Sequence, residues 1–179
     1  MDVALSGGKK VVNEYIDKSV DLGIDIIEIS SIARSIDDIE MCHLIERISN
    51  KGIRVLNEIG VAFAHSEIDD NAIFINRLIK QSTKYLKAGC WKIVIESEGL
   101  TENLDKIDYR WSVIDSIISP LELSQFIVEA DNQDILCKYI EIYGPKINMM
   151  IDHNRLLKME AARLGFGPSQ FLWGKVVRY

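Results

Sequence analysis

The sequence predicts an α/β protein with a parallel sheet, and three observations indicate this fold class. Five short runs rich in Ile and Val recur along the chain, and each is followed by a helix-like stretch. Such alternation gives a parallel sheet with right-handed crossovers. The strand interiors are continuously apolar, as in strands that are covered on both faces. Four of the runs also end in a glutamate.

The predicted elements have the lengths and boundary signals of strands and helices. The expected strands are 24–30, 53–59, 91–97, 124–130 and 146–151. The expected helices are 9–22, 37–50, 67–87, 104–117, one ending at 143 and one ending at 164. Gly23 supplies the left-handed residue that ends the first helix. Ser35 is the possible N-cap of the helix at 37–50. Asp131 or Asn132 is that of the helix ending at 143, and Asp152 that of the helix ending at 164.

The four glutamates decide between an open doubly wound sheet and part of a closed barrel. They stand in Ile-Ile-Glu28, Leu-Asn-Glu58, Val-Ile-Glu96 and Ile-Val-Glu129. In a (βα) barrel the carboxyl ends of the strands carry the chemistry, so this register favours the barrel. Side chains alternate between the two faces of a strand. The inward side chains one layer below the glutamates are then Ile26, Leu56, Val94 and Ile127. The alternative is that some of these carboxylates pair with interior bases or cap the next helix.

Composition and charge limit the classes of function that the chain can have. With 179 residues, 47% of them hydrophobic, residues 1–179 are expected to form a single domain. The net charge of −6 argues against nucleic acid and against an anionic membrane as the main partner. No segment approaches about 18 uninterrupted apolar residues, so no membrane span is expected. The N-terminus does not have the pattern of a secretion signal.

The cysteines indicate a reducing compartment. Cys42, Cys90 and Cys137 are odd in number, far apart and beside apolar residues. We interpret them as buried free thiols of a cytoplasmic protein. Their spacing is too wide for a cysteine-based metal site.

The strand ends carry Ile-Glu-Ile-Ser at 27–30, Leu-Asn-Glu-Ile-Gly at 56–60, Ile-Val-Ile-Glu at 93–96, Val-Glu-Ala at 128–130 and Ile-Asn-Met at 147–149. In order and spacing, these segments resemble the later strands of the phosphosulfolactate synthase family. The resemblance implies a (βα)8 TIM-type barrel that adds sulfite to phosphoenolpyruvate with Mg2+. The product, phosphosulfolactate, leads toward coenzyme M in methanogens and to sulfolactate elsewhere. A plant heat-stress group shares the pattern.

The chain departs from this family in length. The family has about three strand–helix units before the point that matches residue 1, so only about five C-terminal units are expected here. A five-strand arc does not close, and it leaves two sheet edges and an apolar interior. We therefore expect a fragment or shortened gene, or a partner that covers the gap. That partner would be a second copy of the chain or a complementing N-terminal half.

The chain also departs from the family in its charged residues. The family's Glu-Ile-Ser-Asp-Gly, Glu-Val-Gly-Lys-Lys, Ile-Glu-Gly-Arg-Glu and Leu-Arg-Gly-Asp-Thr correspond here to segments 28–32, 58–62, 95–99 and 166–170. Two lysines and two arginines are lost. Phosphate and sulfite need Arg, Lys or backbone donors. These losses therefore weaken the specific reaction more than they weaken the fold.

The remaining polar groups give the candidate site. Carboxylates are hard oxygen ligands, and Mg2+ takes one or two of them with water and substrate oxygens. By position, Glu58, Glu96 and Glu129 are the candidate metal ligands, and Glu28, Glu58 and Glu96 the candidate catalytic residues. The division of roles among the glutamates stays open.

Three further residues are candidate contacts for a small anionic substrate. Ser30 follows Glu28 at a strand end. Asn148 occupies the family's strand-end Asn, although a structural hydrogen bond explains it equally well. Gly167 offers a backbone donor for phosphate, although a helix C-terminal turn also explains the glycine.

Two functions from different classes follow. The first is a phosphosulfolactate synthase-like carbon–sulfur lyase, or a divergent relative acting on a small carboxylate or enol phosphate. The retained glutamates favour it. The second is a catalytically reduced half-barrel that works as a binding or assembly module. The absent strands and bases favour this alternative.

Overall fold

The computed structural model describes residues 7–30, 36–59, 72–167 and 169–174. Its strands are β1 (Ile26–Ile29), β2 (Arg54–Ile59), β3 (Lys92–Ile95), β4 (Phe126–Glu129) and β5 (Met149–Met150). Its α-helices are α2 (Gly8–Asp21), α3 (Asp38–Ser49), α4 (Ala72–Lys87), α5 (Trp111–Ile118), α6 (Gln133–Tyr143) and α7 (Leu156–Arg163). The 3-10 turns are η1 (Lys106–Asp108), η2 (Leu123–Gln125), η3 (His153–Arg155) and η4 (Gln170–Leu172).

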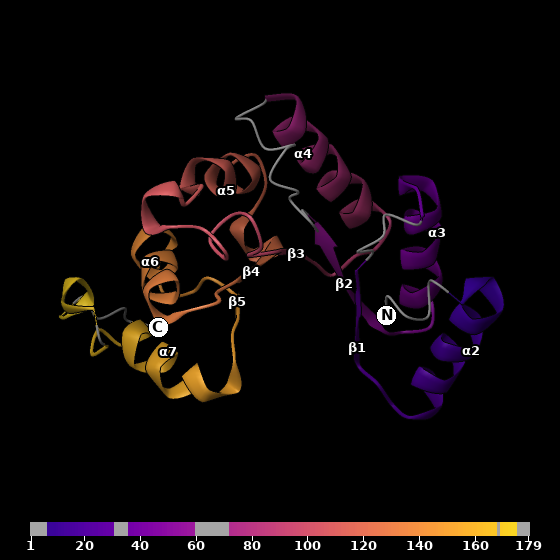
Figure 1. Ribbon diagram of the computed structural model, residues 1–179. Coiled ribbons are helices and arrows are strands. Elements are labelled where there is room, and N and C mark those ends of the chain that lie inside the picture. The colour runs from indigo at the N-terminus through magenta and orange to yellow at the C-terminus, as the bar shows by residue number, and fades with distance from the viewer. Residues whose placement is uncertain (1–6, 31–35, 60–71, 168, 175–179) are drawn as a thin grey trace.

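The strands form one sheet in the order β1-β2-β3-β4-β5, and every pair is parallel. Figure 1 shows the strands following an arc with the helices along its outer side. This arrangement confirms the predicted partial (βα) barrel. Within the described residues, β1 pairs only with β2 and β5 only with β4, so both are edge strands.

The two faces of the sheet have different environments. The face toward the helices is buried and forms the core with them, through Ile27, Ile29, Val55, Ile93, Ile95, Phe126 and Val128. The other face lies inside the arc. There the pairing aligns Glu28 with Leu56, Glu58 with Val94, and Val94 with Ile127. Paired residues of parallel strands share a face, so the predicted parity holds.

The boundaries of several elements differ from the expected ones. The expected helix at 104–117 begins only at Trp111, because the chain first makes the η1 turn. The fifth strand, expected at 146–151, shortens to Met149–Met150 because only two of its residues pair with β4. Asp152 does not cap the last helix; its carboxylate lies 3.1 Å from Arg155 Nη1. Residues 67–71 and Ser35 lie outside the described residues.

The free thiols lie largely in the core. Cys90 and Cys137 are buried, whereas Cys42, expected to be buried, is half-buried. Burial raises the pKa of Cys90 to about 12, because a thiolate would lose its hydration there. Its Sγ lies 3.3 Å from the carbonyl oxygen of Val55 and 3.0 Å from that of Lys92, either of which can accept its single proton. This thiol is therefore inert at neutral pH.

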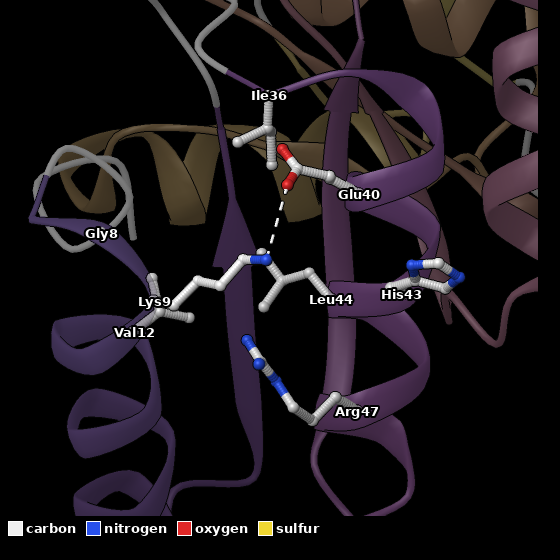
Figure 2. Close-up of a pocket in the computed structure, with 8 residues that line it drawn as sticks. All are labelled: Gly8, Lys9, Val12, Ile36, Glu40, His43, Leu44 and Arg47. Atoms are coloured by element: carbon white, nitrogen blue, oxygen red, sulfur yellow. Dashed lines mark ion pairs between the residues drawn. The ribbon is translucent and has the colours of Figure 1, made fainter.

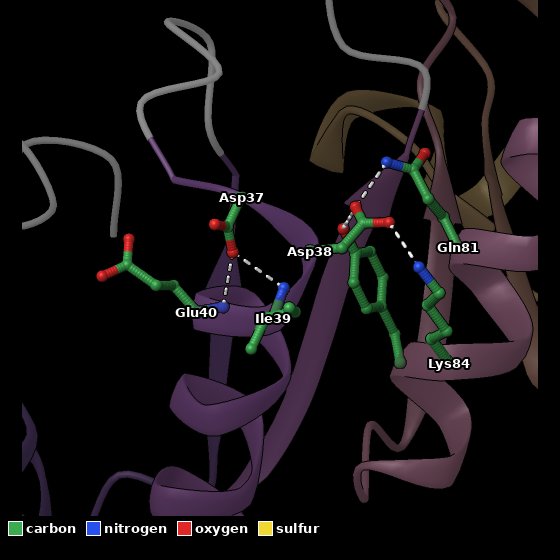
Figure 3. Close-up of polar contacts among 7 residues, drawn as sticks. Asp37, Asp38, Ile39, Glu40, Gln81 and Lys84 are labelled. Carbon is green, nitrogen blue, oxygen red and sulfur yellow. Dashed lines mark hydrogen bonds and ion pairs between the residues drawn. The ribbon is translucent and has the colours of Figure 1, made fainter.

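Helix α3 begins with two adjacent aspartates that have separate roles (Figure 3). Asp37 is the N-cap, and its Oδ1 accepts from the amides of Ile39 and Glu40, each at 2.9 Å. Asp38 instead faces α4.

The Asp38 carboxylate links α3 to α4. It accepts hydrogen bonds from Gln81 Nε2 at 2.8 Å, Lys84 Nζ at 2.9 Å and the Tyr85 hydroxyl at 3.0 Å. Burial raises the pKa of Asp38, but these three hydrogen bonds outweigh it and hold the pKa below its ordinary value. The ionised form is therefore the one that stabilises the helix pair.

Replacing Asp38 tests this link through its pH dependence. We expect Asp38→Asn to lower the free energy of unfolding by about 1 kcal/mol at pH 7, because a neutral amide oxygen accepts the bonds from Gln81 and Tyr85 more weakly than a carboxylate does. The exposed Lys84 adds little. The folded pKa lies below the ordinary value, so this stabilisation is present above the unfolded pKa of 3.8 and is lost as the pH falls through the folded one. Urea unfolding from pH 6 to pH 2.5 should show the wild-type advantage shrinking at the acid end. A constant difference, or an equal loss in the exposed control Asp105→Asn, contradicts it.

Candidate functional site

Three carboxylates meet at the carboxyl end of the sheet. Glu96, Glu102 and Glu129 each place an oxygen within 4.8 Å of the other two, and all three side chains are half-buried. Glu96 directly follows β3, Glu129 ends β4, and Glu102 comes from the loop after β3. The structure thus brings together two of the four strand-end glutamates and adds a third that strand patterning did not predict.

The register of β3 and β4 explains why Glu96 and Glu129 meet. Ile95 pairs with Val128, so the next residues along the two strands, Glu96 and Glu129, lie level with each other. Both point to the inner face, because they are in phase with the paired residues Val94 and Ile127. Adjacent parallel strands lie about 4.8 Å apart, which brings the two carboxylates into one small volume.

Ser97 holds two of these carboxylates in place. Its amide donates to Glu129 Oε2 at 3.1 Å, and its hydroxyl lies 3.0 Å from the same oxygen and 2.8 Å from Glu102 Oε2. The side chain is 1% exposed. A hydroxyl has one proton, so it donates to only one carboxylate at a time. When it donates to Glu102, Glu129 Oε2 still accepts the Ser97 amide; when it donates to Glu129, the approach to Glu102 Oε2 has no proton, and a cation would offset the repulsion.

A tight loop returns Glu102 to the strand end. The carbonyl oxygen of Ser97 accepts the amides of Leu100, Thr101 and Glu102 at 2.9 to 3.0 Å. Gly99 and Asn103 have φ angles of 70° and 60°, the left-handed region that Gly and Asn tolerate best. These two turn residues were the available signal for Glu102, because they mark a chain reversal on each side of it.

The electrostatics of the cluster favour a cation. The carboxylate oxygens of the cluster lie within 4.8 Å of one another. At that distance two ionised carboxylates repel by on the order of 3 kcal/mol at an effective dielectric constant of 20. A bound cation would offset this repulsion among the three groups. Carboxylate and hydroxyl oxygens are the hard donors that Mg2+ accepts. The donor set of Glu96, Glu102, Glu129 and Ser97 therefore fits the magnesium ion that the sequence resemblance implies.

Glu58 and Glu28 lie lower on the inner face. Glu58 pairs with Val94, two residues before Glu96, which is about 6.5 Å along the strand. Glu28 on β1 pairs with Leu56 on β2, and Leu56 pairs with Lys92 on β3. Lys92 precedes Glu96 by about 13 Å along the strand. Glu58 is half-buried and Glu28 is exposed. Among the described residues, neither belongs to the carboxylate cluster.

The three predicted substrate contacts are dispersed. Ser30 is half-buried just beyond β1. Asn148 donates its amide to the carbonyl oxygens of Phe126 at 3.0 Å and Ser124 at 3.5 Å, toward the amino-terminal end of β4. Gly167 packs where a Cβ would lie 2.8 Å from Ala162 Cα, and its carbonyl oxygen accepts from Trp173 Nε1 at 2.7 Å. A packing reason therefore accounts for this glycine.

A second polar contact supports the rim of the site. Thr101, 1% exposed, lies with its hydroxyl 3.3 Å from Asp131 Oδ1, and Asp131 Oδ2 accepts from the Asn132 side chain at 3.0 Å. Asn132 also caps α6 by accepting from the amide of Ile135. This links the loop after β3 to the loop after β4, so the two segments that supply the carboxylates are held together.

Comparison with known families identifies the relationship. The sequence model of (2R)-phospho-3-sulfolactate synthase (ComA) matches residues 1–167. The chain belongs to this family. The match confirms the resemblance predicted from the strand ends.

Individual relatives of the chain are distant in sequence. The chain is 24% identical to the protein HEAT-STRESS-ASSOCIATED 32 of Arabidopsis thaliana, over 89% of this chain and 61% of that protein. It is 26% identical to the phosphosulfolactate synthase of Methanothermobacter thermautotrophicus, over 86% of this chain and 60% of that protein. It is 25% identical to the phosphosulfolactate synthase of Methanocaldococcus jannaschii, over 98% of this chain and 69% of that protein. The chain thus spans about six-tenths to seven-tenths of the length of these relatives.

A solved structure supports the fold alone. D-psicose 3-epimerase, crystallised in the presence of D-fructose, superposes with a TM-score of 0.51 at 15% sequence identity, covering 77% of this chain and 56% of that one.

Over the described residues, no helix combines the length and the apolarity that crossing a bilayer requires.

Proposed function

We propose that this member of the ComA family is a phosphosulfolactate synthase-like carbon–sulfur lyase, or a divergent relative that acts on a small carboxylate or enol phosphate. The observation that carries the proposal is the convergence of Glu96, Glu102 and Glu129 at the carboxyl end of the sheet. In barrels of strand–helix units this end is where catalytic groups gather. The free thiols suit a cytoplasmic location.

The chain's own residues would divide the work as follows. Glu96, Glu102 and Glu129 would hold Mg2+, with Ser97 fixing the carboxylates of Glu102 and Glu129. The ion would supply a positive charge against the negative charge that develops on a substrate oxygen. When the sulfur lone pair of sulfite forms a bond to the methylene carbon of an enol phosphate, the double-bond electrons move toward the carboxylate. The adjacent carbon then takes a proton.

Glu58 is the best candidate to move that proton. It is half-buried and lies on β2, level with Val94, which is two residues before Glu96 on β3. Glu58 is therefore near the cluster but outside it. A carboxyl group in this position can exchange a proton with substrate without competing for the ion. Glu28 lies lower and is exposed, so its catalytic role has less support.

The lost bases favour the divergent form of the proposal. Glu98 and Ser97 stand where the family has Arg and Gly, and the segment 60–71 after Glu58 contains no Lys or Arg. The bound cation would then carry most of the attraction for the substrate. A small monocarboxylate or a single enol phosphate suits such a site better than a multiply charged pair of anions.

The alternative is a half-barrel that serves as a binding or assembly module. The edge strands β1 and β5 favour it, together with apolar side chains exposed near the two ends of the arc. Ile26 on β1 is 37% exposed, and Leu157 and Phe166 beyond β5 are 84% and 68% exposed. We propose that a second copy of the chain or a complementing N-terminal half covers these surfaces.

Metal binding is tested by thermal and chemical unfolding with and without divalent cation. Mg2+ or Mn2+ at about 100 times its Kd should raise the free energy of unfolding of the wild type by about 2.7 kcal/mol. Glu129→Gln and Glu102→Gln should remove most of this gain, because each deletes a charged ligand. Glu98→Gln is the matched control, since Glu98 is exposed and outside the cluster. An equal loss in Glu98→Gln, or no stabilisation of the wild type, counts against the site.

The reaction is tested by mixing the protein with phosphoenolpyruvate, sulfite and Mg2+ and following the loss of enol absorbance. The strict form of the proposal predicts turnover that falls at least 100-fold in Glu129→Gln, because loss of a metal ligand removes several kcal/mol of charge stabilisation. Absence of turnover in a protein that still binds Mg2+, with or without an added N-terminal half, would exclude the strict reaction and favour the assembly module.

Association through the edges is tested by sedimentation velocity. We expect a species larger than the 20.3 kDa chain. Ile26→Lys should shift it toward monomer, because it places a charge beside the β1 edge. Ile107→Lys is the control, since Ile107 is 91% exposed on η1. A strictly monomeric wild type, or equal dissociation by Ile107→Lys, would rule out this interface.

A further inference from the structure

A cleft of about 400 Å³ separates α2 from α3 on the outer side of the sheet (Figure 2). The cleft lies where α2 begins, at Gly8 and Lys9, and where the chain enters α3, at Ile36 and Glu40. The Glu96–Glu129 cluster lies on the inner face of β3 and β4 instead. The lining residues are Gly8, Lys9, Val12, Ile36, Glu40, His43, Leu44 and Arg47.

Two bases from different helices extend into this cleft. Figure 2 shows the Arg47 guanidinium reaching between α2 and α3 toward Lys9. Among the described residues, Arg47 Nε is buried without a hydrogen-bond partner. Lys9 Nζ lies 4.0 Å from a Glu40 carboxylate oxygen, with side chains 90% and 52% exposed. A contact so long and so exposed is weak, so Lys9 is available to another anion.

The floor and the rim of the cleft differ in chemistry. Val12 and Leu44 are buried and Ile36 is half-buried, which gives an apolar floor. At the rim, α2 is 14 residues long, has no acidic residue in its first turn and has no side-chain cap on Gly7. Among the described residues, the first amides of α2 therefore have no side-chain cap, and they lie beside Lys9 at one end of the cleft. Even with Glu40, the lining is net positive in a chain of net charge −6.

We propose that this cleft binds a small organic phosphate. Lys9, Arg47 and the first amides of α2 would hold the phosphate, because a guanidinium, an ammonium and backbone amides are the donors that phosphate oxygens accept. Val12, Ile36 and Leu44 would contact the apolar body of the ligand. Glu40 opposes the phosphate and limits its affinity. This site is separate from the proposed metal site and does not depend on it.

The test titrates the full chain with inorganic phosphate and with butyl phosphate. Amide chemical shifts of Gly8 and Lys9 and the 31P linewidth report binding. Butyl phosphate should bind more tightly than inorganic phosphate, because the floor is apolar. Lys9→Gln and Arg47→Gln should each weaken binding roughly tenfold. Lys10→Gln is the matched control: Lys10 makes the same charge change one residue away, lies 3.8 Å from Glu14 and is not part of the lining.

Glu40→Gln gives a prediction of opposite sign. It should strengthen phosphate binding several-fold, since it removes a repulsive charge and releases Lys9, whereas a purely structural Lys9–Glu40 pair predicts no gain. Equal weakening by Lys10→Gln, no effect of Arg47→Gln in a folded protein, or shifts confined to other helices would overturn the proposal. Glu129→Gln should leave phosphate binding unchanged, so failure of this site and failure of the metal site are distinguishable.

Discussion

The pairing of β3 with β4 is the constraint on which the candidate site depends. Ile95 opposite Val128 sets Glu96 and Glu129 level on one face. A slip by one residue would turn either carboxylate toward the helices and into the core. The buried Ile93, Ile95 and Val128 prevent that slip, because it would also expose them. The core thus fixes the position of the charges, and Ser97 then fixes the orientation of the Glu129 carboxylate.

Much of this arrangement could be predicted from the sequence, for physical reasons. Continuous apolar strands with Gly at helix ends determine the parallel sheet, and period-two alternation determines that the four glutamates share a face. The level of each glutamate could not be predicted, because it depends on how far each strand is shifted against its neighbour. Glu28 is aligned with Leu56 and Glu58 with Val94, so the glutamates are staggered rather than level. Only Glu96 and Glu129 coincide.

Glu102 shows a second limit of strand patterning. Its position depends on a loop in which one carbonyl oxygen accepts three amides and two residues have positive φ. Loop geometry of this kind is set by hydrogen bonds within residues 97–102, which the periodicity of a strand does not encode. Asn148 illustrates the converse, since a polar residue beside a strand end satisfies backbone carbonyls of the neighbouring strand. Polar residues near strand ends therefore divide between chemistry and backbone satisfaction, and contacts rather than spacing separate the two.

The distribution of charge connects the two proposals. The carboxyl rim of β3 and β4 is acidic and suits a cation, whereas the α2–α3 cleft is net positive and suits a phosphate. The family's lysines and arginines are missing from the corresponding segments of this chain, so in our proposal anion recognition at the rim would fall to a bound ion. A basic cleft on the outer helices is then a place where this acidic chain can recognise phosphate without a metal. The ionic strength of the medium should weaken both kinds of binding, but through opposite signs of local potential.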